Sequence, residues 1–164
     1  MQGNSRFAVA IHVLALVHFA RGNSAGKPVT SERLAECVNT NPVVIRRILG
    51  SLRNAGLVAS QPGPGGGWHL TRRPAEISLR DVYLATEGES IFALPRRVPN
   101  AGCLIGKRMT AVLEHCFRDA EDALLDRLAA VCVADVTASA LGESECPVTP
   151  AIKIVETEVV MTTG

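Results

Sequence analysis

Aromatic residues are scarce in this sequence. Phe, Trp and Tyr make up 4% of its 164 residues, although 47% of the residues are hydrophobic. A core of Ala, Leu and Val side chains favours helices packed on helices over a β-sandwich. At this length the chain can bury one core, or a small domain with an accessory element.

The sequence also lacks a hydrophobic run long enough to span a bilayer. Its longest apolar stretch, residues 7–20, has 14 residues and contains two histidines, whereas a membrane-spanning helix needs about 20. No basic segment with a small-residue cleavage site precedes this stretch, so we expect no signal peptide and no membrane partner.

Paired cysteines and catalytic constellations are missing as well. The five cysteines are odd in number and have no paired spacing, which argues against a disulfide framework and indicates a reducing cytoplasm. No Ser/His/Asp, Cys/His or paired-carboxylate arrangement stands out, and the four histidines form no metal-binding pattern. We therefore expect neither an enzyme nor a metal site.

Acidic residues are absent between Glu36 and Glu76, where five arginines lie. Through Pro74 there are nine basic and two acidic residues, a net charge of +7, and the remainder carries eight basic and fourteen acidic residues, a net charge of −6. A polyanion would be attracted to the first part and repelled by the second. The alternative is that the arginines only solvate a surface.

The spacing of apolar residues and turn formers predicts an ordered set of elements. Helices are expected over residues 5–21, 31–38, 42–55, 78–86 and about 104–133, and strands over 57–61 and 68–71. Asn41 should cap the third helix, with Pro42 at its first position. Residues 62–67 contain only Pro and Gly, which is typical of a hairpin tip whose side chains have no packing role.

This order is typical of a winged helix-turn-helix, a mainly α fold with a small two-stranded wing. The helix over 42–55 would enter the major groove of double-stranded DNA by its N-terminal end, where an arginine can read guanine or bind phosphate. Glycines at the wing tip would let main-chain N–H groups approach phosphates. The predicted DNA-binding residues are Asn41, Val43, Val44, Arg46, Arg47, Gly63, Gly65, Gly66, Arg72 and Arg73. Of the two helix arginines, we expect Arg46 to face DNA.

Two other functions fit part of this pattern. A winged helix can serve as a protein-interaction module without specific DNA binding. A glycine-rich loop can cradle a nucleotide phosphate, but no Gly-Lys-Ser/Thr follows the glycines here. DNA binding accounts for the arginines and the hairpin together.

The helix predicted over about 104–133 is too long for a domain of this size to cover, so we expect it to pair with a second copy in a homodimer. The chain then divides into a DNA-binding domain (1–86), a linker (87–102), a dimerisation helix with a following turn (103–141) and a tail (142–164). The weak alternation of the tail is compatible with an edge strand or with disorder.

Four segments together resemble the Rrf-two family of bacterial transcription regulators. They cover residues 41–49, 55–58, 63–67 and 77–83, and residues 4–12 are similar to the cluster-free, YwnA-like branch of that family. The resemblance implies a homodimeric, sequence-specific repressor with the long helix as its seam and two wings flanking a palindromic operator.

The linker departs from the cluster-binding members of that family, which have three cysteines there. Cys103 is the only cysteine between Cys37 and Cys116, and one thiolate cannot hold an iron–sulfur cluster. We therefore expect no cofactor. A helix start and nearby cations favour the thiolate, which makes Cys103 a candidate redox sensor; the alternative is an inert cap. Cys37 is expected to be packed, Cys116 and Cys132 to lie inside the long helix as core residues, and Cys146 to be exposed.

Overall fold

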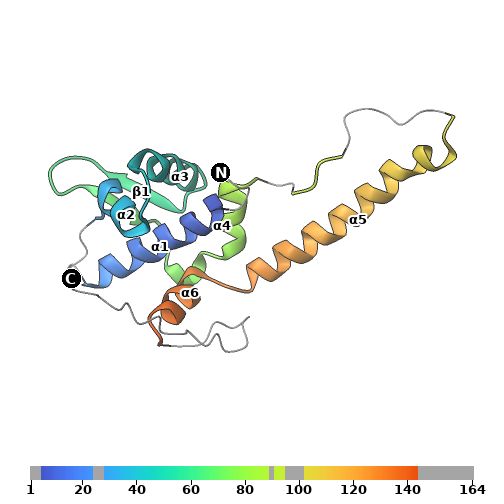
Figure 1. Cartoon of the computed structure of the whole chain (residues 1–164). Coiled ribbons are helices and arrows are strands. Elements are labelled where there is room, and N and C mark those ends of the chain that lie inside the picture. The colour runs from blue at the N-terminus through green and yellow to red at the C-terminus, as the bar shows by residue number, and fades with distance from the viewer. Residues whose placement is uncertain (1–4, 24–27, 89–90, 95–101, 144–164) are drawn as a thin grey trace, which may run out of the picture.

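Helix α1 (Ser5–Asn23) forms the centre of the fold. A computed structural model describes residues 5–23, 28–88, 91–94 and 102–143 of the chain. Helices α2 (Ser31–Val38), α3 (Pro42–Asn54), α4 (Leu79–Thr86) and α6 (Val133–Ala140) pack around α1 in one lobe, from which α5 (Leu104–Ala129) projects (Figure 1). The α1 residues Ala10, Val13 and Leu14 are fully buried.

The helix-turn-helix is shaped by local hydrogen bonds at its helix ends. The Thr30 hydroxyl accepts a hydrogen bond from the Arg33 N–H at 3.3 Å, and Asn39 ends α2 with a left-handed φ of 55°. The Asn41 side-chain oxygen then accepts from the Val43 N–H at 2.8 Å, and Pro42 occupies the first turn of α3. The Asn41 cap agrees with the sequence prediction, because it depends on residues only two apart.

The wing is a two-stranded antiparallel sheet, β1 (Val58–Gln61) and β2 (Gly67–Leu70), in which Val58 lies opposite Leu70. Its strands begin one residue away from the predicted starts. Val29 pairs with its edge: the Val29 N–H donates to the Trp68 carbonyl at 3.2 Å, and the Trp68 N–H donates to the Val29 carbonyl at 2.8 Å. Assigning Gly67 to a tip without packing was wrong, because a Cβ there would lie 2.8 Å from the Val29 carbonyl oxygen.

The long helix is shorter than its sequence pattern predicts. It ends at Ala129, and the chain is extended at Cys132, which pairs with Ser78 before α6 begins. The Leu79 N–H donates to the Val131 carbonyl at 2.8 Å, and the Val133 N–H donates to the Ile77 carbonyl at 2.9 Å. These bonds to the start of α4 break the helix, although the apolar spacing continues through Val131. Helix α6, where only a short turn was expected, packs on α1 and on the short 3-10 helix η1 (Pro74–Glu76).

Part of the linker lies against α5. The N–H groups of Ile91 and Phe92 donate to the same carboxylate oxygen of Glu121, at 2.7 and 3.1 Å. The rings of Phe92 and Phe117 stack with their centroids 4.7 Å apart. Residues 95–101 of the linker and the tail 144–164, including Cys146, lie outside the described residues.

The cysteines are less buried than predicted. Cys37 is exposed at the end of α2, and Cys116 is exposed on α5. Cys132 is half-buried and begins α6, so it is not inside the long helix. The expectation that these three cysteines are packed core residues was therefore wrong for Cys37 and Cys116. Within the described chain, no helix is both long and apolar enough to cross a membrane.

Candidate nucleic-acid interface

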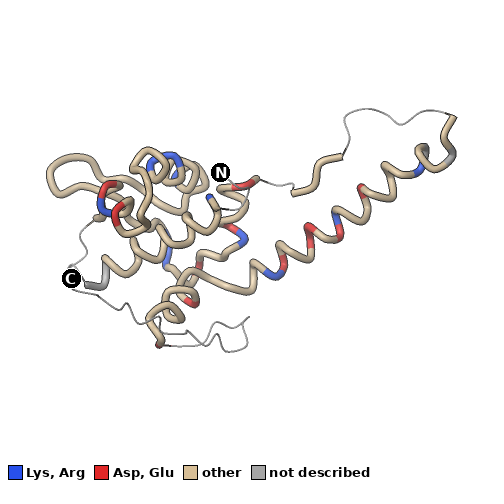
Figure 2. Tube along the Cα trace, in the orientation of Figure 1, with Lys and Arg blue, Asp and Glu red and all other residues tan. Residues whose placement is uncertain are grey.

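Helix α3 turns one face to the core and the other to solvent. Its apolar residues Ile45, Ile48, Leu49 and Leu52 are almost completely buried. On the opposite face Val43 is 48% exposed, and the arginines of the first two turns are exposed as well. Val44, which the sequence placed among the DNA-binding residues, is half-buried and packs against the core. The exposed face of α3 thus consists of one apolar residue near its start and a set of arginines (Figure 2).

Arg46 is held by its own helix and by α2. Its Nε donates to the Pro42 carbonyl at 3.3 Å, and a terminal nitrogen lies 3.9 Å from a Glu32 carboxylate oxygen. The Glu32 backbone N–H, the Ser31 hydroxyl and then the Arg46 charge lower the pKa of Glu32, so this carboxylate is ionised near neutral pH. The stretch that lacks acidic residues in sequence therefore has an acidic neighbour in space.

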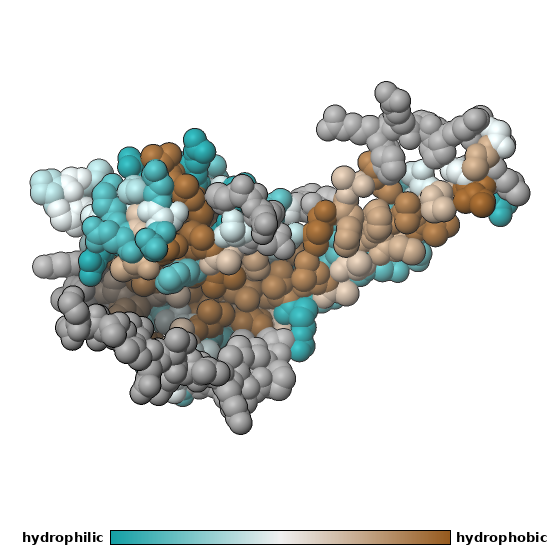
Figure 3. Space-filling model, viewed as in Figure 1, coloured by the Kyte–Doolittle hydropathy of each residue, from teal (hydrophilic) through white to brown (hydrophobic). Residues whose placement is uncertain are grey.

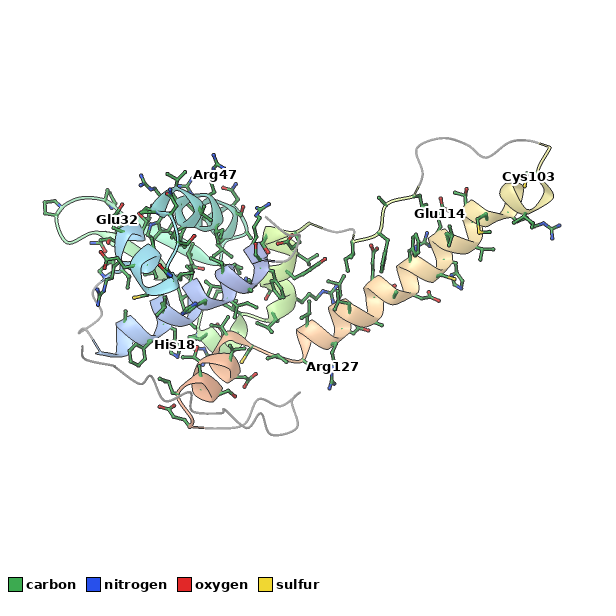
Figure 4. All side chains as sticks on the ribbon, viewed as in Figure 1. His18, Glu32, Arg47, Cys103, Glu114 and Arg127 are labelled. Atoms are coloured by element: carbon green, nitrogen blue, oxygen red, sulfur yellow. The ribbon has the colours of Figure 1, made fainter. Side chains whose placement is uncertain are left out.

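Arg47 is oriented differently. It points away from the lobe into solvent, whereas Glu32 lies on α2 beside α3 (Figure 4). Among the described residues, Arg47 has no hydrogen bond or ion-pair partner. Of the two arginines, Arg47 is thus the one with all its donors available to a ligand.

The wing tip lies at the end of the hairpin, away from α5 (Figure 1). Gly63 and Gly65 have left-handed φ angles of 97° and 77° and open space around them. A Cβ on Gly66 would collide with the Gln61 carbonyl oxygen. The conformation of the hairpin thus explains why glycine occupies each of these three positions. The exposed backbone at Gly63 and Gly65 is also free to contact a phosphate.

Arg72 and Arg73 follow β2 and lie beside α1. With His18 they help line an open hollow of about 630 Å³. The Arg73 Nε donates to a Glu76 carboxylate oxygen at 2.9 Å, and this pair raises the pKa of Arg73 and lowers that of Glu76. The predicted DNA-binding residues thus fall into three groups, at the α3 face, the wing tip and the end of β2.

The sequence pattern missed three residues that shape this surface. Glu32 pairs with Arg46 across 14 positions of sequence, and Val29 extends the wing from a distant loop. Neither contact has a local sequence signal, because each joins residues from different elements. Gly50 lies in the middle of α3, where an added Cβ would meet nothing within 4 Å. Unlike the two contacts, this residue could have been noticed in the sequence, because a glycine inside a helical pattern often has a packing or functional reason.

The described residues offer no ligand set for a metal. Nowhere in the described ranges do three or more His, Cys, Asp or Glu side chains come together as a metal-binding group. Cys103 lies at the far end of α5 (Figure 4), where its Sγ accepts a hydrogen bond from the Gly106 N–H at 3.2 Å. Cys116 lies further along the same helix, and Cys37 and Cys132 lie on other segments of the fold.

Known proteins share both the sequence and the fold. A family model described as "Rrf2: Iron-dependent Transcriptional regulator" matches residues 4–139. YwnA of Bacillus subtilis (strain 168), named as an HTH-type transcriptional regulator, is 39% identical over 134 residues, covering 81% of this chain and 95% of YwnA. The HTH-type transcriptional regulator IscR of Aliivibrio salmonicida (strain LFI1238) is 32% identical over 93 residues, covering 57% of this chain and 52% of IscR.

Solved structures agree. A crystal structure described as that of a DNA-binding protein superposes with a TM-score of 0.62 at 34% identity, covering 80% of this chain and 98% of that one. CymR, the global cysteine regulator of B. subtilis, has the same fold, with a TM-score of 0.61 at 20% identity over 85% of this chain and 98% of CymR.

The family description mentions iron, but the residues of this chain do not fit an iron site. A cluster usually takes four ligands, and the linker contributes one cysteine. What the chain shares with its relatives is the sequence over most of its length and the winged-helix fold. The protein is a DNA-binding transcription regulator rather than an enzyme, and it belongs to the Rrf2 family.

Proposed function

We propose that the protein is a homodimeric repressor that recognises a palindromic operator through α3 and its wing. The exposed face of α3 carries this proposal: Arg47 has no partner within the described chain, and Val43 beside it is available to a thymine methyl. Arg46 completes the face, with Glu32 fixing its direction. As a regulator of chromosomal genes, it would act in the cytoplasm.

The remaining predicted residues have supporting roles in this proposal. The backbone at Gly63, Gly65 and Gly66 would meet the phosphates or the minor groove. Asn41 would orient the start of α3 through its cap. Arg72 and Arg73 would add positive charge beside the wing, Arg73 less strongly because Glu76 neutralises it. Residues 1–86 would then form the DNA-binding domain, with α6 packed on it, and 87–102 the linker.

The dimer seam is proposed along α5. Ile105, Met109 and Val112 are 68%, 42% and 56% exposed, and Cys116 continues the same stripe at a spacing of three or four residues. The space-filling view shows hydrophobic surface running along α5 away from the lobe (Figure 3). A contiguous apolar stripe of this kind on a projecting helix is typical of a surface that another helix covers. A second copy supplies such a helix.

Thiol chemistry at Cys103 is a further part of the proposal. Its side chain is exposed at the N-terminus of α5, where its Sγ accepts a hydrogen bond from the Gly106 N–H. Oxidation there would alter the end of the seam farthest from the DNA-binding lobe. Treating the protein with peroxide should weaken its DNA binding, and Cys103→Ser should remove this sensitivity. A Cys103→Ser protein that remains equally sensitive would assign the effect to another thiol.

Selection from a random pool of duplex DNA tests the proposal as a whole. The wild-type protein should enrich duplexes with two inverted half-sites, and binding to them should weaken steeply between two salt concentrations, because bound phosphates release counterions. Placed upstream of a reporter gene, the selected duplex should lower expression when the protein is present. If no duplex is enriched, the proposed function is wrong.

A further inference from the structure

Gly50 is at an unexpected place for a glycine. It lies in the interior of α3, where glycine is less favourable than alanine because the unfolded chain loses more freedom. Its φ is not in the left-handed region, and an ideal Cβ would meet nothing within 4 Å. The fold of this chain would therefore accommodate a side chain at position 50.

Seven other glycines have a conformational or steric reason within the fold. The structure describes the surroundings of eight glycines. Six of them have a positive φ between 69° and 154°: Gly56, Gly63, Gly65, Gly67, Gly88 and Gly142. A Cβ on Gly66 would meet backbone atoms of the hairpin. Gly22 and Gly106 also lie in helices without a positive φ, but in a terminal turn of α1 and of α5, so Gly50 is the one in a helix interior.

The neighbours of Gly50 indicate what approaches it. Arg46 and Arg47 lie one turn before it on the same face of α3, and Arg53 lies one turn after it, all three exposed. Val43 lies two turns before it on the same line. Arg46 and Arg47 are separated by roughly 100° around the helix axis, one on each side of this line. At Gly50 the helix backbone is therefore uncovered between guanidinium groups. Such a surface lets a polyanion approach the helix closely.

We propose that Gly50 is the point at which base edges on the floor of the DNA major groove come closest to α3. This inference rests on the proposed function. The missing side chain lets the helix lie deep in the groove, so that Arg46 and Arg47 can reach opposite walls. A side chain at position 50 would hold the helix away from the bases and leave contacts to the phosphates largely intact.

The test uses the full-length protein and two duplexes, one selected from a random pool by the wild type and a scrambled duplex of the same composition. Gly50→Ala should raise the melting temperature and yet weaken binding to the selected duplex by about tenfold, the scale of one lost base-pair contact. Gly50→Leu should weaken it further. Affinity for the scrambled duplex should change by no more than about twofold, because phosphate contacts supply most non-specific binding. Ser51→Ala is the matched control, since it raises helix propensity in α3 without adding an atom.

Two results would overturn the inference while leaving the proposed function in place. In one, Gly50→Ala and Gly50→Leu bind the selected duplex as tightly as the wild type, although Arg47→Ala binds weakly. In the other, both duplexes lose affinity equally, which would place Gly50 against the phosphate backbone instead of the bases. Failure of the wild type to select any duplex would overturn the proposed function and this inference with it.

Discussion

At the scale of single residues, the two neighbouring arginines of α3 differ because of their surroundings. Arg46 lies within 3.9 Å of Glu32 and bonds its own helix, whereas Arg47 extends into solvent. An ion pair as exposed as Arg46–Glu32 adds little to stability. Its effect is to orient the Arg46 side chain and to offset part of its positive charge. It leaves Arg47 as the stronger local source of positive potential on this face.

Arg47→Ala is expected to lower the affinity for the selected duplex by about 1–3 kcal/mol if the guanidinium reads a guanine edge. Base preference should then relax at one operator position. If Arg47 instead binds phosphate, affinity should fall on every sequence and the slope of log affinity against log salt should decrease by about 1. A mobility shift at several salt concentrations distinguishes the two.

Arg33 provides the control for Arg47, since it is exposed on α2 and paired with Glu36 at 3.1 Å. Arg33→Ala should leave base preference unchanged. If Arg47→Ala retains both the affinity and the salt dependence of the wild type, α3 is not the reading helix.

The Asp135 carboxylate makes the stability at the start of α6 depend on pH. The Cys132 thiol and the Cys132 N–H both donate to this carboxylate, at 2.9 Å each, and these bonds lower the pKa of Asp135. A carboxylate with a lowered pKa in the folded state adds stability above its unfolded pKa and loses it as the pH falls through the folded value. Asp135→Ala should therefore lower the free energy of unfolding at pH 7 by about 1 kcal/mol.

The difference between Asp135→Ala and the wild type should shrink as the pH falls below about 3.9, the usual value for Asp. Asp135→Asn keeps an accepting oxygen but does not titrate, so its unfolding free energy should change less with pH than that of the wild type. Chemical denaturation between pH 7 and pH 3 measures all three proteins. A constant gap between wild type and Asp135→Ala would show that the carboxylate charge adds no stability there.

At the scale of elements, the wing depends on a contact that comes from outside the hairpin. Gly67→Ala would place a methyl group 2.8 Å from the Val29 carbonyl oxygen, at a residue with a φ of 154°. We expect this substitution to destabilise the protein by about 1–3 kcal/mol, as overpacking usually does. Gly63→Ala has a positive φ but open surroundings, so it should cost less. Urea unfolding compares them, and equal losses would mean that the Val29 contact adds nothing.

The elements predicted well from sequence are those whose ends depend on near neighbours. Thr30, Asn41 and the Ser78–Asp81 capping box each satisfy backbone groups two or three residues away, and so their residue types alone indicate them. The end of α5 could not be predicted in this way. Its apolar spacing continues, and the break at Ala130–Cys132 arises from hydrogen bonds to Ile77 and Leu79, more than 50 residues earlier.

The candidate site shows the same limit. The sequence predicted that Arg46 and Arg47 would be exposed on α3, and both are. It favoured Arg46 as the one that faces DNA, but it gave no sign of the Arg46–Glu32 pair, because Glu32 comes from another helix. Val44, which the sequence placed among the DNA-binding residues, is half-buried against the core. The spacing of apolar residues indicates which face of a helix is exposed to solvent. The contacts of each side chain on that face depend on how the helix packs against other elements.

At the scale of the whole molecule, the apolar stripe of α5 has the strongest consequence for assembly. Val112→Glu should place a charge in the proposed seam, giving monomers in light scattering and loss of binding to the selected duplex. Ala111→Glu is the matched control, because position 111 is exposed on the other side of the same helix. A Val112→Glu protein that remains dimeric would move the seam elsewhere.

The scattered cysteines lead to a prediction about the purified protein. Prepared without oxygen, it should be colourless and contain no stoichiometric iron or sulfide, because Cys103 is the only linker cysteine and a cluster usually needs four ligands. Removal of metals with a chelator should leave its DNA binding unchanged. A coloured preparation with one cluster per chain would overturn this expectation.

The anchoring of α5 has a consequence for the spacing of DNA sites. Its carboxyl end is tied to the lobe through Val131 and Val133, while its other end lies far from the lobe. With 26 residues, the helix is a lever about 39 Å long. A swivel of about 10° at the tied joint would displace the far tip of the helix by roughly 7 Å relative to the lobe. In a dimer joined along α5, the angular play of the Ala130–Cys132 joint therefore determines how much variation in half-site separation the protein tolerates.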